Sequence, residues 1–417
     1  MNDISRFMDE NGRIKTWAAK NRFKYEILKY ISTKFVNGRF YTEKEVNALI
    51  AKWHTFGDYF MIRRGLIDNG FLSRTKDGSR YWKEDRDNCK DIINLIEGNY
   101  EIENVKNIFH IKGGYGSQVY YVSSGSGEYI FKEQVNDSIN HPENESVILD
   151  ILSENDIPVS KICCSKNGNH VFQIGNNSYH LQKFIDGKSY SRNAAPEWLL
   201  YGSARMLGKI QTAMEKLPLL PTGINQGFFD NMTPERAKLN YASTLDLAKQ
   251  NSDGEIIEAV NSKVQMLDAF KNLKFDVSRM TCKNTHGDYK INQIICGKDE
   301  INAIVDFTSA CIHPICWEII RSYSLADKDC IDGSINIENF KKYVACFLEY
   351  GSLNSYDLKM MPYVYFYQSL VSDYFGQYYS LKNNKHLLLD DALHSVNLCK
   401  WFEHNITRLE DVLVSGF

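Results

Sequence analysis

Apolar residues recur every three or four positions over residues 22–35, which predicts a helix with one hydrophobic face. A second helix is predicted over residues 42–53. Thr42 and Glu45 mark its start, because they have the spacing of a capping box, in which each side chain bonds a free backbone amide. The first part of the chain is therefore predicted to be helical.

A third helix is predicted over about residues 57–69, and Gly70 is placed to end it because glycine accepts a left-handed backbone. Residues 71–83 then fit two short strands joined by a turn at Asp77-Gly78. Three helices followed by a hairpin is the order of a winged-helix domain, whose third helix usually reads the major groove of DNA.

The charge of this region differs from that of the rest. Residues 1–83 contain 17 Lys and Arg against 9 Asp and Glu, a balance of +8. Because the net charge of the whole chain is −3, the remaining residues carry −11. This asymmetry predicts an anionic partner, such as nucleic acid, for residues 1–85. The basic side chains placed to reach DNA are Arg63 and Arg64 on the third helix and Arg74, Lys76 and Arg80 on the hairpin. The alternative is a helical domain whose solvated basic face serves protein contacts or dimerisation.

From about residue 99 the pattern changes to short strands separated by turns. The predicted strands are 105–114, 117–124, 127–135, 161–166, 170–175 and 178–185. The first turn contains Gly113, Gly114, Gly116 and Ser117, and a glycine loop of this kind lets backbone amides approach phosphate groups.

The second half of the chain is predicted to be mostly helical. Helices are expected at 198–214, 234–250 and 254–271, with three long helices from about 335 to 417, whereas 216–236 is expected to be irregular because it is rich in proline and glycine. Aromatic residues crowd the middle one of the last three helices. Core packing is the favoured interpretation, and lining of a pocket for a ring is the alternative.

The residues richest in chemistry are HGDYKINQ at 286–293, followed by Asp306. Phosphoryl transfer needs one carboxylate that orients the acceptor hydroxyl, and a second carboxylate with a side-chain amide that holds Mg²⁺. Asp288 fits the first role and Asp306 the second. Gln293 or Asn292 fits the third.

This stretch resembles the catalytic loop of the aminoglycoside phosphotransferase and choline kinase family, which reads His-Gly-Asp, four residues, then Asn. Here the last position is Gln293 with Asn292 beside it, so either amide is a candidate metal ligand. The resemblance implies that Asp288 is the catalytic base and that His286 bonds backbone near the metal-binding aspartate. Lys290, two residues after Asp288, is a candidate to place positive charge near the transferred group, and the alternative is a lysine that faces solvent.

The same resemblance implies an ATP site in the preceding strands. Lys132 would contact the α and β phosphates and pair with Glu145, or else with Glu143, on a following helix. Backbone groups from Gln182 to Phe184 would bond the purine edge at a hinge.

Two positions after Asp306 differ from the family pattern. Where the family has an Asp-Pro step and a later aspartate, this chain has His313-Pro314 and then Glu318. We expect Glu318 to brace the catalytic loop. At the other end of the chain, residues 38–82 resemble a small domain found in bacterial transcriptional regulators.

The expected fold class is α+β: a two-lobed protein-kinase-like phosphotransferase fold preceded by a small winged-helix-like α/β domain. The predicted boundaries are 1–85 for the basic domain, 86–98 for a connector, 99–187 for the small lobe and 188–417 for the large, mostly helical lobe.

Composition excludes several classes of protein. No apolar run approaches the roughly 20 residues of a membrane span, and residues 1–13 lack the apolar region of a signal peptide, so we expect a cytoplasmic protein. The ten cysteines contain no CxxC pair and no repeated spacing, which predicts free thiols.

The predicted function is ATP- and Mg²⁺-dependent transfer of the γ-phosphoryl group to a hydroxyl of a small molecule, such as an aminoglycoside, a choline-like amine or another metabolite. The alternative is a catalytically silent protein that binds a nucleotide or effector and regulates the N-terminal domain, with Gln293 as the sign of lost activity. A protein kinase is disfavoured, because no activation segment with an Ala-Pro-Glu type end follows Asp306.

Overall fold

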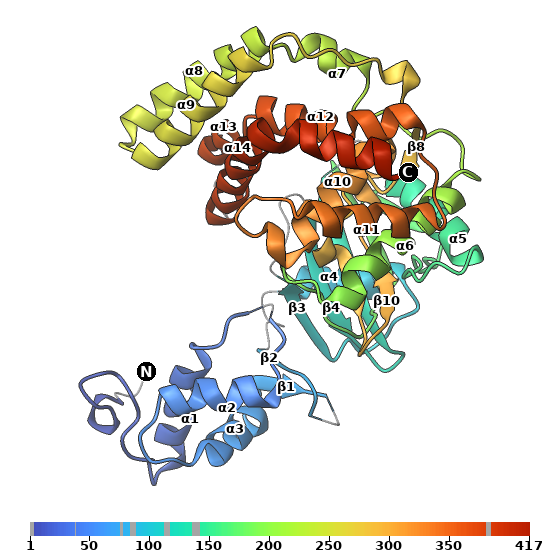
Figure 1. Ribbon diagram of the computed structural model, residues 1–417. Helices are drawn as coiled ribbons and strands as arrows, with labels where there is room; N and C mark the ends of the chain where they lie inside the picture. Colours follow the sequence, from blue (N-terminus) through green and yellow to red (C-terminus); the bar gives the residue numbers. More distant parts are fainter. Residues whose placement is uncertain are drawn as a thin grey trace. The chain divides into compact units, whose positions relative to one another are not determined.

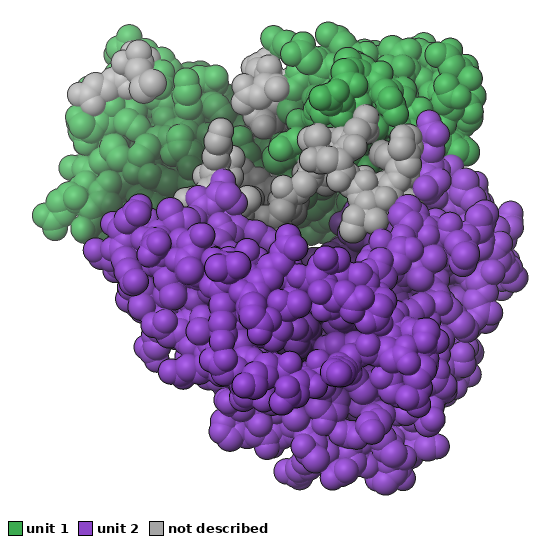
Figure 2. Space-filling view, turned by 90° about the horizontal axis from the view of Figure 1, so that it is seen from above, with its two compact units in different colours: residues 1–136, 162–184 green, residues 137–161, 185–417 purple. Residues whose placement is uncertain are grey.

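The computed structural model describes residues 4–37, 39–75, 78–83, 89–111, 117–135, 142–380 and 385–417 (Figure 1). The chain divides into two compact units, which Figure 2 colours separately. The first contains Met1–Asn136 and Ile162–Phe184, and the second contains Asp137–Lys161 and Ile185–Phe417. Within the described ranges, no helix is long and apolar enough to cross a membrane.

The first unit begins with an N-terminal module, residues 4–83. It consists of α1 (Asn21–Ser32), α2 (Glu43–Lys52) and α3 (Tyr59–Asp68), followed by an antiparallel hairpin of β1 (Leu72–Arg74) and β2 (Tyr81–Lys83). The predicted capping box of Thr42 and Glu45 starts α2, and Gly70 has a left-handed φ of 70° after α3. The predicted order of three helices and a hairpin is therefore confirmed, while the winged-helix assignment stays a prediction. Asp77 of the predicted turn lies outside the described residues.

A five-stranded antiparallel sheet forms the rest of this unit, in the order β3-β4-β5-β7-β6. Its strands are β3 (Asn107–Ile111), β4 (Ser117–Ser123), β5 (Glu128–Val135), β6 (Val171–Ile174) and β7 (Asn177–Lys183). Helix α4 (Lys90–Asn99) occupies most of the predicted connector and packs Ile93 and Ile96 into one apolar cluster with Phe131 and Leu181 of the sheet.

The predicted strand at 161–166 is wrong. That segment meets the sheet at a single bridge, Ile162 with Gln182. The chain then turns away, because the amide of Lys166 donates to the carbonyl oxygen of Asn99 at the end of α4. The glycine turn at Gly113, Gly114 and Gly116 lies outside the described residues.

The hairpin of the N-terminal module packs against the sheet through aromatic side chains. Trp82 of β2 and Phe40 form one cluster with Phe109, Tyr121 and Phe184, and three of these five side chains are almost fully buried. The N-terminal module and the sheet therefore share a hydrophobic contact within one unit.

The second unit is mostly helical, and two small antiparallel sheets of two strands each lie between its helices. Its helices are α5 (Pro142–Glu154), α6 (Glu197–Met214), α7 (Gln226–Asn231), α8 (Pro234–Gln250), α9 (Gly254–Ala269), α10 (Ile315–Ala326), α11 (Ile337–Leu348), α12 (Ser355–Val371), α13 (Tyr374–Ser380) and α14 (Lys385–Gly416). One sheet pairs β8 (Cys282–Thr285) with β11 (Cys311–Pro314), and the other is a hairpin of β9 (Ile294–Cys296) and β10 (Ile301–Ile304).

Two predictions for this half need comment. Residues 216–236 are not wholly irregular, because the Asn225 side chain caps the short helix α7 by accepting from the Phe228 amide. The three long helices predicted toward residue 417 are α11, α12 and α14, and the short α13 lies between the last two. The break before α13 is held by Lys263, whose Nζ donates to the Ser372 carbonyl oxygen at 2.9 Å.

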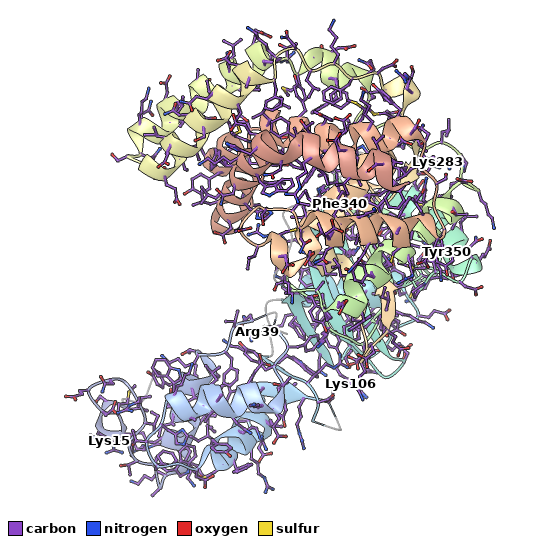
Figure 3. The ribbon with its side chains drawn as sticks, in the orientation of Figure 1. Lys15, Arg39, Lys106, Lys283, Phe340 and Tyr350 are labelled. Atoms are coloured by element: carbon purple, nitrogen blue, oxygen red, sulfur yellow. The ribbon has the colours of Figure 1, made fainter. Side chains whose placement is uncertain are left out.

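The core of the second unit is rich in aromatic rings, as predicted for the crowded middle helix. Tyr365, Phe366 and Tyr367 of α12 are all buried. Phe340 of α11, labelled in Figure 3, packs its ring centroid 4.8 Å from that of Tyr323 on α10.

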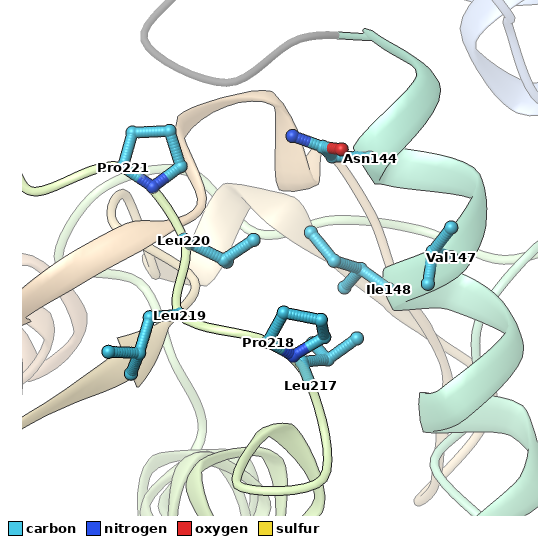
Figure 4. A pocket seen from close by; sticks show the side chains of 8 residues that line it. All are labelled: Asn144, Val147, Ile148, Leu217, Pro218, Leu219, Leu220 and Pro221. Atoms are coloured by element: carbon cyan, nitrogen blue, oxygen red, sulfur yellow. The ribbon is translucent and has the colours of Figure 1, made fainter.

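Helix α5 faces the loop that follows α6, and a cavity of about 200 Å³ lies between them (Figure 4). Its lining is apolar apart from one amide: Asn144, Val147 and Ile148 of α5, and Leu217, Pro218, Leu219, Leu220 and Pro221 of the loop. Because all eight side chains belong to the second unit, the contact anchors α5 within it.

Candidate functional site

The stretch 286–293 connects β8 to β9, so the two small sheets of the second unit fix both of its ends. Gly287 has a φ of 79°, and a Cβ there would lie 1.9 Å from the carbonyl oxygen of Ser309. Only glycine fits, because any side chain would both strain the backbone and overlap the segment before β11. This close approach holds the loop against the segment that follows Asp306.

Asp288 is the one carboxylate of the loop, and three side chains contact it. Arg321 Nη2 lies 2.6 Å from its Oδ1 and Lys290 Nζ lies 2.7 Å from its Oδ2. Gln293 Nε2 also donates to Oδ2 at 2.9 Å. Burial raises the pKa of Asp288, but the two cations outweigh this effect and hold that pKa at about 2. The side chain is therefore an anion at any physiological pH.

Glu318 stabilises the loop through hydrogen bonds on both sides of Asp288, as expected from the sequence. It is fully buried on α10 and accepts a hydrogen bond from the Thr285 hydroxyl and another, at 3.1 Å, from the Tyr289 amide. Burial raises the pKa of Glu318 to about 7, even though the Tyr289 amide lowers it. Both flanks of Asp288 are thus bound to one side chain of α10.

This raised pKa predicts a pH-dependent stability. The folded protein binds the Glu318 proton more tightly than the unfolded chain, where the pKa is 4.5. The stabilisation is therefore complete below pH 4.5 and is lost as the pH rises to about 7, by on the order of 3 kcal/mol. We expect urea unfolding at pH 5 and pH 8 to show a larger loss of stability for the wild type than for Glu318→Gln, which does not titrate. Parallel losses in the two proteins would contradict this prediction.

His286 bonds backbone, as predicted: its Nε2 donates to the Val305 carbonyl oxygen at 3.1 Å, next to Asp306. Burial lowers the pKa of His286, against the opposing effects of Asp288 and Asp306, so the ring is neutral. Its ring centroid lies 4.4 Å from that of Phe307. The contacts tie the catalytic loop to the segment that carries Asp306.

The amide of Gln293 links the two acidic positions. Its Nε2 donates to Asp288 and also lies 3.4 Å from Asp306 Oδ2, while its Oε1 is buried and has no hydrogen-bond partner among the described residues. Asn292, by contrast, is exposed. Thr308 Oγ1 donates to Asp306 Oδ1 at 2.9 Å.

These groups fit a magnesium ion. Mg²⁺ prefers carboxylate and carbonyl oxygens and usually binds one or two carboxylates together with substrate phosphates. A buried amide oxygen without a partner costs free energy unless a ligand satisfies it. Gln293 Oε1 and the Asp306 carboxylate are therefore the oxygens that the described residues present to a metal.

His313, which replaces an aspartate of the family pattern, has a structural role. Its Nδ1 accepts a hydrogen bond from the Ile224 amide at 2.8 Å. Burial, reinforced by the charge of Arg321, lowers the pKa of His313 to about 4, so the ring is neutral. It thus anchors the loop before α7 to β11.

The residues predicted to bind ATP are divided between the two units. Lys132 on β5 is buried and pairs in register with His180 of β7, and burial together with this lysine lowers the pKa of His180. Glu145 on α5 is 1% exposed and belongs to the second unit. The pairing of Lys132 with Glu145 stays a prediction.

The hinge and the glycine turn are only partly described. Ser117 begins β4, and Gln182 of β7 is buried. The amide of Phe184 donates to the Glu128 carbonyl oxygen at 3.0 Å. That amide is therefore engaged in the sheet, and the backbone contacts to a purine predicted from Gln182 to Phe184 cannot include it.

Several basic residues of the N-terminal module bind protein groups. Arg63 lies 2.6 Å from Glu43 and donates to Asn47, and Arg80 pairs with Glu128 of the sheet at 3.1 Å. Arg64 is 86% exposed, and Arg74 is exposed too. Lys76 lies outside the described residues, and nucleic-acid binding by this module stays a prediction.

Sequence reasoning missed Arg321. It lies one turn beyond Glu318 on α10, so the two side chains share a face of the helix. The signal for Arg321 was this pair of opposite charges, one turn apart in a helix that buries most of its residues.

Two family models match this chain. One, described as a phosphotransferase enzyme family, matches residues 109–334. The other, described as an uncharacterized protein conserved in bacteria (DUF2087), matches residues 13–83. An uncharacterized protein encoded in the ileS 3′ region of Staphylococcus aureus is 33% identical over 115 residues, which are 28% of this chain and 76% of that protein.

Solved structures of small-molecule kinases have a similar fold. The microcompartment-associated aminopropanol kinase has a TM-score of 0.53 at 12% identity, over 78% of this chain and 99% of its own. The amicoumacin kinase hAmiN, in complex with AMP-PNP, Ca²⁺ and Ami, has a TM-score of 0.50 at 13% identity, over 74% of this chain and 92% of its own. The predicted kinase-like α+β fold is thereby confirmed.

Proposed function

We propose, from the premise that this chain belongs to the phosphotransferase enzyme family, that it transfers the γ-phosphoryl group of ATP to a hydroxyl group of a small molecule in the cytoplasm. The observation that carries the proposal is the Asp288 carboxylate, joined through the Gln293 amide to the Asp306 carboxylate. One carboxylate for the acceptor and another for a metal, held side by side, is the arrangement that phosphoryl transfer requires.

Asp288 would orient the acceptor. Its carboxylate accepts a hydrogen bond from the acceptor hydroxyl, whose oxygen forms a bond to the γ-phosphorus as the bond to the leaving oxygen of ADP breaks. The hydroxyl proton passes to Asp288 late in this step, because a transition state with little bond formation needs only a weak base. Lys290, 2.7 Å from the same carboxylate, supplies positive charge for the transferred group.

Asp306 and Gln293 would hold Mg²⁺ through the oxygens described above. When bound, the ion neutralises charge on the β and γ phosphates. Asn292 is not our choice for the metal, because its side chain is exposed, whereas Gln293 lies beside both carboxylates and its buried Oε1 has no hydrogen-bond partner among the described residues. We therefore propose Gln293 from the two amides that the sequence left open.

The nucleotide would be bound by the residues that the sequence predicts for it. Lys132 would contact the α and β phosphates with Glu145 as its partner, Gly113, Gly114, Gly116 and Ser117 would offer backbone amides, and the chain at Gln182 would contact the purine.

The test is ATP consumption across a panel of hydroxyl compounds, with Mg²⁺ and with EDTA. We expect ADP to form in a way that depends on both the acceptor and the metal. Binding of ATP without acceptor-dependent turnover on any compound would favour the silent regulator instead. Nucleotide affinity, measured separately by calorimetry, distinguishes this outcome from a protein that binds no ATP.

A further inference from the structure

Several cations lie in the region around Asp288. Lys290 comes from the catalytic loop and Arg321 from α10, and both contact the same carboxylate. A third, Arg192, pairs with Asp391 of α14. Burial raises the pKa of Asp391, while Arg192, Lys290 and Arg321 lower it, so these three cations face one region of the second unit.

Carboxylates lie close to all three cations. Asp288 meets two of them at once, and Asp391 pairs with the third. Asp306 contacts the Thr308 hydroxyl and the Gln293 amide, and under the proposed function it binds the metal. When a substrate hydroxyl takes a position at Asp288 and the nucleotide phosphates draw Lys290, Arg321 remains as a buried cation beside the acceptor.

One donor of Arg321 has no hydrogen-bond partner among the described residues. Its side chain is 19% exposed, and its guanidinium lies over the ring of Trp317, with 5.4 Å from Cζ to the ring centroid. Nη2 contacts Asp288, whereas Nη1 is buried and has no hydrogen-bond partner among the residues described. Leaving a buried charged donor unsatisfied is costly, so a ligand acceptor atom is the partner that fits.

The shape of the Arg321 guanidinium indicates which ligand groups it can bind. A guanidinium presents a planar fork of donors that matches a carboxylate or a phosphate. We propose that the acceptor substrate carries an anionic group, a carboxylate or a phosphate, within a few bonds of the hydroxyl that is phosphorylated, and that Arg321 binds this group. The short separation follows from the contact of 2.6 Å between Arg321 Nη2 and the Asp288 oxygen that would receive the hydroxyl.

The same geometry disfavours amines. An ammonium group near the reacting hydroxyl would meet two cations already bound to the nearby carboxylate, and like charges placed together weaken binding. The inference rests on the proposed function and deepens it: it selects hydroxy acids and phosphorylated polyols over aminoglycosides and choline-like amines.

The experiment compares four compounds that differ in one substituent of the same three-carbon frame: glycerol, glycerate, glycerol 3-phosphate and 3-amino-1,2-propanediol. Their binding is measured by calorimetry in the presence of Mg²⁺ and AMP-PNP, and ATP consumption is measured with each. The proteins are the full chain as wild type, Arg321→Gln, Arg321→Lys and Arg205→Gln. Arg205 is the matched control, because it forms a bidentate surface pair with Glu349.

We expect glycerate or glycerol 3-phosphate to bind at least tenfold more tightly than glycerol or the amine. Arg321→Gln should remove this preference while AMP-PNP affinity stays within twofold, and Arg321→Lys should restore it only in part because the fork is lost. Arg205→Gln should behave as the wild type. The difference in affinity between glycerate and glycerol 3-phosphate shows whether the site prefers a carboxylate or a phosphate.

Other outcomes overturn the proposal. These are equal or tighter binding of glycerol or the amine, no binding of either anion, or an Arg321→Gln variant that lowers kcat equally with all acceptors while keeping the preference, which would make Arg321 a positioning residue only. If Arg321→Gln does not fold, the wild-type series and Arg321→Lys still decide. Arg321-dependent anion binding without any metal-dependent ATP consumption would sustain the anion site and reject the kinase.

Discussion

Replacing Asp288 with asparagine is expected to lower kcat about a thousandfold. Asparagine keeps the shape of the side chain and one oxygen for Arg321, but it loses the negative charge that, under the proposed function, orients the acceptor hydroxyl and takes its proton. Nucleotide affinity should stay within a few-fold, because the proposal assigns Asp288 to the acceptor rather than to ATP. Steady-state ADP formation and calorimetric titration with AMP-PNP measure the two quantities.

Asp268→Asn is the matched control, because Asp268 lies at the end of α9 and pairs with Lys238. It should leave kcat unchanged. The pKa of Asp288, about 2, also predicts that its ionisation causes no change of rate above pH 5. An Asp288→Asn enzyme with wild-type turnover would remove Asp288 from the mechanism and with it the central contact of the proposal.

The second large effect is expected for Asp306→Asn, again about a thousandfold in kcat, together with weaker metal binding. Asp306 has a φ of 71°, in the left-handed region that asparagine and aspartate tolerate better than other side chains. The backbone should therefore keep its shape while the metal loses a charged ligand. Binding of Mn²⁺ in the presence of ADP, followed by electron paramagnetic resonance, reports the metal directly.

Asp299→Asn serves as the control here, because Asp299 is exposed in the turn between β9 and β10. The metal affinity of this variant should equal that of the wild type. Unchanged Mn²⁺ affinity in Asp306→Asn would show that the metal is held elsewhere, and Gln293 would then lose its assigned role as well.

Much of the architecture follows from local patterns. Helix α1 is predictable because its apolar residues repeat at the helical period, and α2 because Thr42 and Glu45 satisfy each other's amides within one turn. The predicted strand at 161–166 is wrong because a contact distant in sequence overrides the local pattern. Its apolar residues suit a strand, but the pairing is decided by Asn99, far away in sequence, which binds Lys166 and draws the segment off the sheet.

The charge of the basic N-terminal module also depends on tertiary contacts for its meaning. A charge of +8 is visible in the sequence, but the sequence cannot show which cations are available to a partner. In the fold, Arg63 is bound by Glu43, and Arg80 lies against the rings of Phe40 and Phe184 while pairing with Glu128. Net charge is a sum over residues, whereas availability depends on neighbours brought together by folding.

The sequence by itself determined the kinds of group that the site contains: a carboxylate in a glycine-bearing loop, a second carboxylate and an amide, at spacings that local backbone geometry can hold. Only the tertiary structure decided which amide faces the carboxylates and which side chain binds Asp288. Gln293 turns inward while Asn292 is exposed, and Arg321 reaches Asp288 across 33 residues. Spacing along the chain sets contacts within a few residues, but a contact between distant side chains exists only after the helices have packed.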